Sequence, residues 1–520
     1  MSRSYLMTID CGTNSVRSII FDAVTGIQVS VAQRDWYHKE SSIPGAIDFD
    51  TGANWELLRI CISDSLRNQS IDPSEIAAVT ATSFRHGIVC LDRHGKEIFG
   101  CINVDARAEK QVIKLVKDGI ASEIYGINGD WPSIQALPRL MWMKENQPEV
   151  YHNIWRMLMA SDWVVYKLCE ATVSEPSNAS STALFDLKSR NWSDSIVKMC
   201  DLRGDIFPEI VDAGTVVGEV SHSAAEQTGL LAGTPVVVGP ADTQAGLVGI
   251  GAIKRGMSSV VGGTFWLETQ VLDEPKLDME MRLRTQCHCE PNQWIIEGCS
   301  FYIGLSIRWF RNAFCQYEYE TEKLTGIDSY NLLDHMAQSV PIGSYGVQVI
   351  LSDLSNMKAW KHAAPSFVGW DILDAEKSHK GVFFHAMLEN AALQTRGEFS
   401  TIKSITGTGP EVITFCGGCS KSFLWPQLLA DATGAKVRVP VVKEGTALGA
   451  AIYAGKGVGL YHDTQDAIDK LVKFERELEP NWDNHAIYAK LYSQWRVLYA
   501  QHLAMMENGL TKPMWRAAGA

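Results

Sequence analysis

Two stretches of the chain, one near its start and one near its middle, share the pattern strand, glycine, threonine, strand. The first is MTIDCGTNSVRS at residues 7–18, and the second is SSVVGGTFWLET at residues 258–269. Apolar and β-branched residues flank each turn, as is typical of β-hairpins. Glycine lets backbone N–H groups in such a turn approach a phosphate closely. Two such turns, each opening one half of the chain, predict a nucleotide held between two similar lobes.

The first turn, DCGTNS at residues 10–15, has two interpretations. An isolated match of this kind is more often an ordinary hairpin turn. The alternative is a phosphate-binding turn in which Asp10 is placed to hold a cation. The rest of the chain has to decide between them.

Length and composition limit the choice of architecture and partners. A chain of 520 residues is too long for one core, so two or three domains are expected. The formal net charge of -13 offers no basic stripe, which argues against a nucleic-acid partner. No apolar run is long enough to span a membrane, and the first residues do not form a signal peptide, so a cytoplasmic location is expected. The twelve cysteines are scattered in apolar segments and are expected to be reduced.

Short apolar runs alternate with helical patterns along the chain, which predicts an α/β fold. A first domain is expected over residues 1–250, a second over 251–484, and a terminal amphipathic helix with a tail over 485–520. Helices are expected over 54–69 and 384–403, a mainly helical region over about 106–168, and a buried strand over 76–84.

Four glycine turns follow predicted strands, at residues 10–15, 239–246, 262–265 and 417–420. The chain contains neither a G-x-x-x-x-G-K-[ST] motif nor a G-x-G-x-x-G after the first strand, so P-loop and Rossmann sites are not expected. Each turn alone is weak evidence for a nucleotide-binding site, but four such turns in this order are a much more specific signal. Asp242 follows the buried strand TPVVVG; alone it would more often be a helix N-cap, whereas with the other turns it indicates catalysis.

The order of these motifs resembles the FGGY family of carbohydrate kinases. It runs D-x-G-T-x-S-x-R, G-x-x-D-x-x-x-G, G-G-T, G-G-x-S-K-S-x-x-W-x-Q-x-x-A-D and E-x-x-A-L-G-A-A, and it covers residues 6 to 460. Within the family, NVDARA, FYIGLSIRWFRNAFC, HAAPSF and PVVKEGTALGAA resemble the group of autoinducer-2 kinases. The resemblance implies two actin-like, ribonuclease-H-like lobes with ATP in the cleft between them. The chain departs from the family pattern at Asn103, where a tryptophan is more common, and at Gly239-Pro240-Ala241.

The resemblance also implies roles for individual residues. Asp242 would be the general base, and Asp10 would lie near Mg²⁺. The phosphates and the adenosine would face Thr13, Asn14, Gly262, Gly263, Thr264, Gly417 and Gly418. The sugar side, in the first lobe, would contain Arg85, His86, Asp105 and Arg107. Asp105 and Arg107 could equally form a surface ion pair, His86 is expected to be a hydrogen-bonding group rather than a base, and Trp425 is expected to pack in the core.

The sequence thus predicts a kinase that transfers phosphate from ATP, with Mg²⁺, to a primary hydroxyl of a small linear polyhydroxy carbonyl compound. By resemblance this compound is autoinducer-2 in its open-chain form, a dihydroxypentanedione. One alternative is the same chemistry on a pentulose. Alternatives of another class are a sugar sensor that binds ATP without catalysis, and an actin-like filament or chaperone ATPase. The sequence does not predict an oligomeric state.

Overall fold

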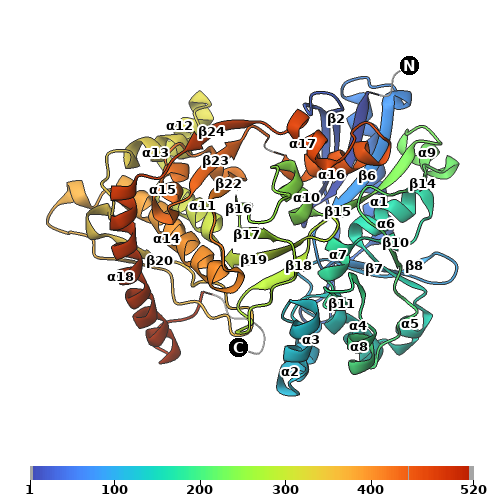
Figure 1. Ribbon diagram of the computed structural model, residues 1–520, viewed down its shortest axis with the longest axis horizontal. Helices are drawn as coiled ribbons and strands as arrows, with labels where there is room; N and C mark the ends of the chain where they lie inside the picture. The colour runs from blue at the N-terminus through green and yellow to red at the C-terminus, as the bar shows by residue number, and fades with distance from the viewer. Residues whose placement is uncertain (1–3, 443, 515–520) are drawn as a thin grey trace.

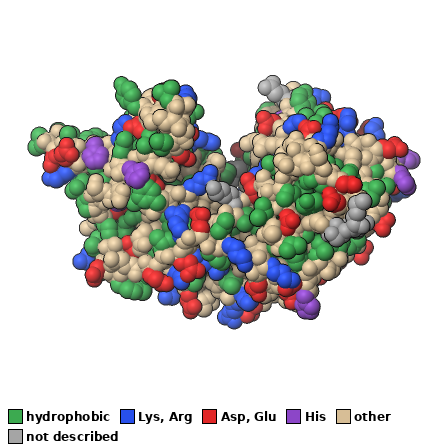
Figure 2. Space-filling model, turned by 90° about the horizontal axis from the view of Figure 1, so that it is seen from above, with side chains coloured by type: hydrophobic (Ala, Val, Ile, Leu, Met, Phe, Trp, Pro, Cys, Tyr) green, Lys and Arg blue, Asp and Glu red, His purple; other side chains and the backbone are tan. Residues whose placement is uncertain are grey.

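Two large mixed β-sheets, one in each half of the chain, form the framework of the computed structural model (Figure 1). The structure describes residues 4–442 and 444–514. Figure 2 shows the surface hollowed between the two halves of the molecule. No helix in the described residues is long and apolar enough to cross a membrane.

The first sheet has the strand order β14-β15-β6-β1-β2-β3. Its strands β1, β6 and β15 are parallel to one another, whereas β2, β3 and β14 pair antiparallel with their neighbours. The strands are β1 (Tyr5–Cys11), β2 (Ser15–Asp22), β3 (Gln28–Asp35), β6 (Ile76–Ser83), β14 (Val216–Glu219) and β15 (Pro235–Ala241).

The second sheet repeats this arrangement with one additional strand, in the order β18-β19-β17-β16-β22-β23-β24. From β19 to β24 the pairings are antiparallel, antiparallel, parallel, parallel and antiparallel, as they are from β3 to β14 in the first sheet. The repetition confirms the α/β fold with two lobes of one topology. The strands are β16 (Ser258–Gly262), β17 (Trp266–Leu272), β18 (Arg284–Cys287), β19 (Trp294–Ser300), β22 (Val412–Cys416), β23 (Lys436–Pro440) and β24 (Phe474–Leu478).

A smaller five-stranded sheet and a group of helices extend the first lobe. Its strands are β4 (His38–Glu40), β5 (Ile47–Phe49), β7 (Ile88–Leu91), β8 (Glu97–Cys101) and β9 (Arg156–Met159). The helices are α2 (Glu109–Lys117), α3 (Ile120–Asn128), α4 (Ala136–Asn146), α5 (Pro148–Asn153) and α6 (Ala160–Cys169). The region expected to be mainly helical is therefore helical apart from β9, which pairs with β7.

Long helices cover the second sheet. The expected helix over 384–403 is α14 (Lys380–Thr406), which starts at a His379 cap and ends at Gly407, where φ is 82°. The terminal helix is α18 (Trp482–Glu507), which packs on α14 and on α15 (Trp425–Thr433). Trp425 is buried and stacks on Trp266 with ring centroids 4.8 Å apart, so its expected core position is confirmed.

Several further helices and short strand pairs complete the described chain. The expected helix over 54–69 is α1 (Thr51–Arg67); it begins earlier than expected because the Asp50 carboxylate caps it by accepting from the N–H of Ala53. The remaining helices are α7 (Pro176–Ser180), α8 (Asp194–Met199), α9 (His222–Thr228), α11 (Ile303–Phe314), α12 (Gln316–Thr325) and α13 (Ser329–Ala337). The short strands pair as β10 (Val173–Ser174) with β13 (Glu209–Ile210), β11 (Phe185–Asp186) with β12 (Asn191–Trp192), and β20 (Gln348–Ile350) with β21 (Ser366–Val368).

Two helices rich in small residues, α10 (Asp242–Gly249) and α16 (Gly445–Gly457), pack against each other near the middle of the molecule. A β-carbon on Gly249 would lie 1.8 Å from the carbonyl oxygen of Gly445, and one on Gly449 would lie 1.8 Å from that of Ala245. Only glycine permits such an approach of two helix backbones.

The sheets lie on either side of residue 250, but one later segment does not follow that division. Helices α16 and α17 (Thr464–Leu471) belong to the range expected for the second domain, yet α16 packs on strands of the first sheet and α17 packs on α16 in the same buried cluster. Leu448 and Ile452 share a buried cluster with Leu6 of β1. The reason is that the first sheet needs an apolar cover on this face, and the later segment provides it.

Candidate active site

Three parallel strands of the first sheet end together, and each end carries polar side chains. In the register of the sheet, Asp10 of β1 lies beside Thr82 of β6, and Ala241 of β15 lies beside Ser83 of β6. Asp242 directly follows β15, and Arg85 lies two residues after the end of β6. Ligands of α/β sheets bind beyond the carboxyl ends of parallel strands, so this edge is the candidate site.

Asp10 lies in strand β1 and not in a six-residue turn, which corrects the expected extent of that turn. The strands continue to Cys11 and resume at Ser15 because Asp10 pairs with Arg17 across the hairpin. The Arg17 guanidinium forms an ion pair with Asp10 and another, at 2.5 Å, with Glu444 just before α16. Burial raises the pKa of Asp10, and the ion pair with Arg17 opposes part of that shift.

Asp242 is the first residue of helix α10, and the N-cap is Ala241. Because Asp242 is already the first helical residue and Ala241 occupies the N-cap position, the interpretation of Asp242 as an N-cap is wrong. Its carboxylate accepts a hydrogen bond from the N–H of Thr243 at 2.6 Å. Burial raises the pKa of Asp242 to about 6; the charge of Arg85 opposes this shift and that of Asp10 adds to it. The group is therefore largely ionised at neutral pH and still basic enough to take a proton.

The unexpected sequence before Asp242 has a structural explanation. The pairing of β15 with β6 shifts between Val238 and Ala241, so Gly239 and Pro240 form an irregularity in the strand. A β-carbon on Gly239 would lie 2.2 Å from the carbonyl oxygen of Ala81, which explains the glycine. The hydroxyl of Thr82 donates to the carbonyl oxygen of Pro240 at 2.7 Å and fixes the approach to Asp242.

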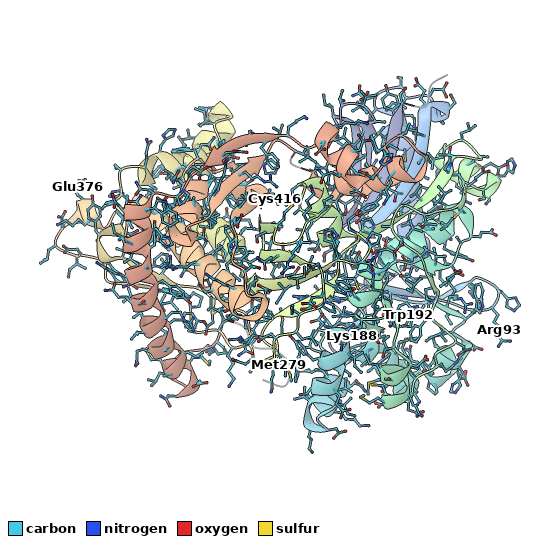
Figure 3. The ribbon with its side chains drawn as sticks, in the orientation of Figure 1. Arg93, Lys188, Trp192, Met279, Glu376 and Cys416 are labelled. Carbon is cyan, nitrogen blue, oxygen red and sulfur yellow. The ribbon has the colours of Figure 1, made fainter. Side chains whose placement is uncertain are left out.

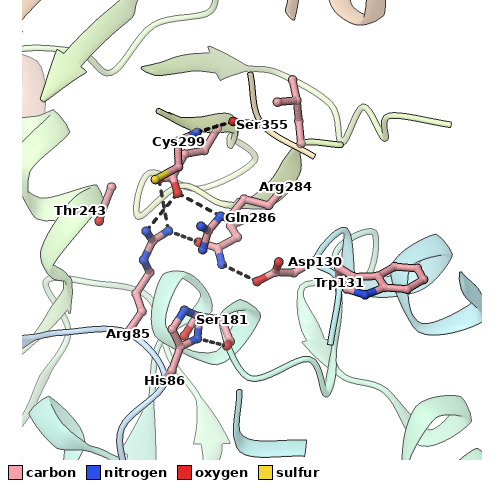
Figure 4. A network of polar contacts seen from close by, with 12 residues as sticks. Arg85, His86, Asp130, Trp131, Ser181, Thr243, Arg284, Gln286, Cys299 and Ser355 are labelled. Atoms are coloured by element: carbon pink, nitrogen blue, oxygen red, sulfur yellow. Dashed lines mark hydrogen bonds and ion pairs between the residues drawn. The ribbon is translucent and has the colours of Figure 1, made fainter. Parts of the chain in front are cut away.

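Arg85 and His86 occupy the segment between β6 and β7, and both are buried. His86 has a φ of 74°, an uncommon backbone conformation for a residue with a side chain. Its ring shares a 2.8 Å hydrogen bond with the carbonyl oxygen of Ser181 (Figure 4). Burial and the nearby arginines hold the pKa of His86 well below its usual value, so the ring is neutral and a poor base. This agrees with a hydrogen-bonding role.

Asp105 and Arg107 form a buried ion pair and not a surface one, with Arg107 Nη2 at 2.7 Å from Asp105 Oδ2. Arg107 also contacts Asp48 at 2.5 Å, and the Asp105 carboxylate accepts from the N–H of Ile47 at 2.7 Å. Arg139 donates to the carbonyl oxygens of Asp105 and His86. Arg139 thus ties the loop that carries Asp105 to the loop that carries His86, and contact of the Asp105–Arg107 pair with a substrate stays a prediction.

The first glycine turn, which is predicted to bind phosphate, is tight. The N–H of Gly12 donates to the carbonyl oxygen of Ser15 at 2.9 Å, leaving Thr13 partly exposed and Asn14 exposed at the tip. Asn103, one of the positions at which the chain departs from the expected pattern, donates through Nδ2 to Thr13 Oγ1 at 2.9 Å. The hydroxyl of Thr13 is therefore held in place by the loop that follows β8.

The glycine turns of the second sheet touch each other. Strands β16 and β22 are parallel neighbours, so Gly262 at the end of β16, with Gly263 and Thr264 after it, lies beside Gly417 and Gly418, which follow β22. Gly417 has a φ of 88°, and a β-carbon there would lie 2.5 Å from the carbonyl oxygen of Gly262. The two turns therefore form one continuous backbone surface.

A β-carbon on Gly418 would meet no atom within 4 Å, in contrast to Gly417. Cys416 and Cys419 flank these glycines and are free thiols. Cys416 packs on a cluster that includes Leu247 of α10, and Figure 3 places it near the middle of the molecule, whereas Cys419 packs on the main core of the second lobe. Burial raises the pKa of each thiol to about 12. Inert thiols on different clusters support the structural interpretation of this C-x-x-C.

A hollow of about 390 Å³ lies along helix α11, lined by Leu305, Arg308, Trp309, Asn312 and Ala313. It adjoins the glycine turn at residues 262–265, because the N–H of Leu305 donates to the carbonyl oxygen of Thr264 at 3.4 Å. The sequence predicted no role for these residues. All five lie in the stretch FYIGLSIRWFRNAFC, which carried part of the family resemblance and was the sequence signal that could have pointed to them.

The residues present fit a nucleotide and a magnesium ion. Open space beside Gly418 and exposed backbone at the turns suit phosphates and an adenosine. Asp10 is an oxygen donor beside the first turn, and Mg²⁺ is commonly held by one or two carboxylates together with substrate phosphates. The described residues contain no group of three or more potential metal-ligating side chains, so a metal held by protein alone is not indicated.

Comparison with known proteins identifies the family. Residues 5–249 match the N-terminal domain, and residues 260–458 the C-terminal domain, of the FGGY family of carbohydrate kinases. Among characterised relatives, the autoinducer-2 kinases of Yersinia enterocolitica and Salmonella typhimurium are each 42% identical to the chain, covering 100% of it and 98% of the relative.

Solved structures of sugar kinases share the fold. The xylulose kinase of Rhodospirillum rubrum superposes with a TM-score of 0.84 at 22% identity, over 97% of this chain and 100% of that one. The gluconate kinase of Lactobacillus acidophilus has a TM-score of 0.83 at 20% identity, over 96% and 98% of the two chains. With both domains matched in order over almost its whole length, the chain belongs to the FGGY family of carbohydrate kinases.

Proposed function

We propose that the protein transfers a phosphoryl group from ATP, with Mg²⁺, to a primary hydroxyl of autoinducer-2 in its open-chain form, a dihydroxypentanedione. The observation that carries the chemistry is the position of Asp242 directly after β15, at the sheet edge where β1 also ends, close enough to Arg85 and Asp10 for their charges to act on its pKa of about 6. The substrate is taken from relatives that are 42% identical over the full chain.

In this mechanism the residues of the chain bind, orient and move one proton. ATP supplies the phosphoryl group, and Mg²⁺ neutralises part of its charge. Asp242 accepts the proton of the acceptor hydroxyl, while Thr243 holds its carboxylate in one orientation. Asp10 would hold the metal and Thr13 the phosphates, and the turn of Gly417 and Gly418 would receive the adenosine in the open space beside Gly418. The acceptor lies against Arg85 and His86, with Asp105 and Arg107 behind them.

A coupled assay of ADP release tests the substrate directly. The panel contains dihydroxypentanedione, xylulose, ribulose and glycerol at equal ATP and Mg²⁺. We expect kcat/KM to be highest for dihydroxypentanedione. A higher value for a pentulose would move the assignment to a sugar kinase of that kind. Binding of a sugar without ADP release from any member of the panel would favour the sensor.

A further inference from the structure

The second lobe reaches across to the acceptor side of the first lobe at Arg85 (Figure 4). Arg85 follows strand β6 of the first sheet, but its guanidinium contacts strands β18 and β19 of the second sheet. Its Nη1 donates to Gln286 Oε1 at 2.7 Å and to Glu297 Oε2 at 3.3 Å, and its Nη2 donates to Glu297 Oε1 at 3.0 Å. The side chain is thus held from two sides by the opposite lobe.

These contacts are shielded from water. Arg85 is 9% exposed, whereas Gln286 and Glu297 are fully buried. Arg284 forms a second ion pair with Glu297 at 3.0 Å. Burial would raise the pKa of Glu297, but the charges of Arg85 and Arg284 outweigh it and keep this pKa below its usual value. Glu297 is therefore an ionised anchor for Arg85.

The contacts with Glu297 and Gln286 also set the orientation of Arg85 near two other residues of the candidate site. The charge of Arg85 acts on Asp242, and Arg85 is adjacent in sequence to His86. A free arginine side chain has many rotamers, whereas a two-point hold on its planar guanidinium selects one. Gln286 is itself fixed, because its Nε2 faces Asp130 at 3.5 Å and its Oε1 receives Gln244 Nε2 at 3.5 Å.

We propose that Glu297 and Gln286 are positioning residues that hold Arg85 for the acceptor, so that the acceptor site is assembled across both lobes. This inference rests on the proposed role of Arg85 in acceptor binding. It gives the second lobe a part in recognising the acceptor in addition to the nucleotide.

Glu297→Gln keeps the shape of the side chain and removes its charge. We expect the KM for dihydroxypentanedione to rise about tenfold or more, the range for losing a hydrogen bond to a charged group. The KM for ATP should change less than about twofold, because the nucleotide turns lie elsewhere. A general loss of folding would instead affect both constants or the yield of folded protein.

The matched control is Glu268→Gln. Glu268 is an equally buried glutamate of the same sheet, but its carboxylate accepts from Ser300 and Thr395 and contacts no arginine. Burial and the nearby Glu398 carboxylate raise its pKa well above the usual value, so the protein already holds it neutral. This variant should keep both KM values of the parent.

A double-mutant cycle with Arg85→Met tests whether Glu297 affects the acceptor KM through Arg85. If Glu297 acts through Arg85, adding Glu297→Gln to Arg85→Met should raise the acceptor KM by less than about twofold. Full additivity of the two effects would overturn the anchoring role. If Glu297→Gln does not fold, Gln286→Met takes its place in the same cycle with the same expectations. If Arg85→Met alone leaves the acceptor KM unchanged, the proposed role of Arg85 fails first, and the anchor has nothing to position.

Discussion

At the scale of single residues, the two carboxylates of the site are held differently. Burial raises the pKa of both, but the Asp10 carboxylate forms an ion pair with Arg17, whereas the Asp242 carboxylate accepts from the N–H and the hydroxyl of Thr243. The ion pair favours the ionised form of Asp10, the form that a metal ligand needs, and a buried carboxylate of raised pKa such as Asp242 suits proton transfer. We therefore expect Asp10 to determine how the rate depends on Mg²⁺ concentration and Asp242 to determine how it depends on pH.

Asp10→Asn should raise the Mg²⁺ concentration needed for half-maximal rate and lower the maximal rate. The reason is that an amide is a weaker ligand for a hard cation than a carboxylate. The measurement is a Mg²⁺ titration at saturating ATP and acceptor. Thr13→Val serves as the comparison and should raise the KM for ATP instead, because its hydroxyl is lost. Parent-like Mg²⁺ dependence and rate in Asp10→Asn would reduce the turn to an ordinary hairpin.

The pH dependence of kcat/KM for the acceptor should show an acid limb near pH 6. The base works in its ionised form, so activity is full above the pKa of Asp242, about 6, and is lost as the pH falls through it. An aspartate of ordinary pKa would place this limb about two units lower. A profile that stays flat down to pH 5 would contradict the assignment of a buried Asp242 as base.

At the scale of elements, local patterns predicted the strands and the long helices, but contacts between elements escaped them. The hairpin at the first turn and α14 follow from apolar periodicity and glycine. That Asp10 lies in the strand depends on the register with Arg17, a residue seven positions away. The partners Glu444 and Glu297 come from distant segments with no local signal, so one sequence could not reveal them.

The double-glycine turn gives a prediction of its own. Gly418→Val should weaken ATP binding, because its side chain enters space that the protein leaves open. Replacing both Cys416 and Cys419 by alanine should keep activity, since both thiols are inert. Calorimetric titration with ATP measures the first effect, and ADP release the second. If Gly418→Val binds ATP normally and the double alanine variant is inactive, the two cysteines and not the glycine would be functional, and the structural interpretation of the thiols would be wrong.

At the scale of the whole molecule, two short strand–glycine–threonine turns predicted the repeated sheet topology. The sequence did not predict that α16 and α17 belong with the first sheet, because a helix rich in small apolar residues can pack on either lobe. The chain thus crosses between lobes more than once, and α10 against α16 forms a close backbone contact. The α10–α16 contact holds this later segment of the chain on the first lobe, whereas the Arg85–Glu297 ion pair connects the two lobes.

Nucleotide turns on both lobes imply that the lobes close on their ligands. Acceptor and a non-hydrolysable ATP analogue together should lower the radius of gyration in solution scattering more than either does alone. Scattering profiles that stay the same in all four states would remove closure from the mechanism.

Turnover of an Asp242→Asn variant tests most directly whether both lobes converge on a base at this position. Burial disfavours the charged form of Asp242, so the neutral variant should fold, and its thermal unfolding midpoint should be no lower than that of the parent. It should also bind ATP with nearly unchanged affinity. Its kcat for dihydroxypentanedione should fall by about a hundredfold or more. A kcat near that of the parent, in a folded variant that binds ATP, would contradict the catalytic role of Asp242.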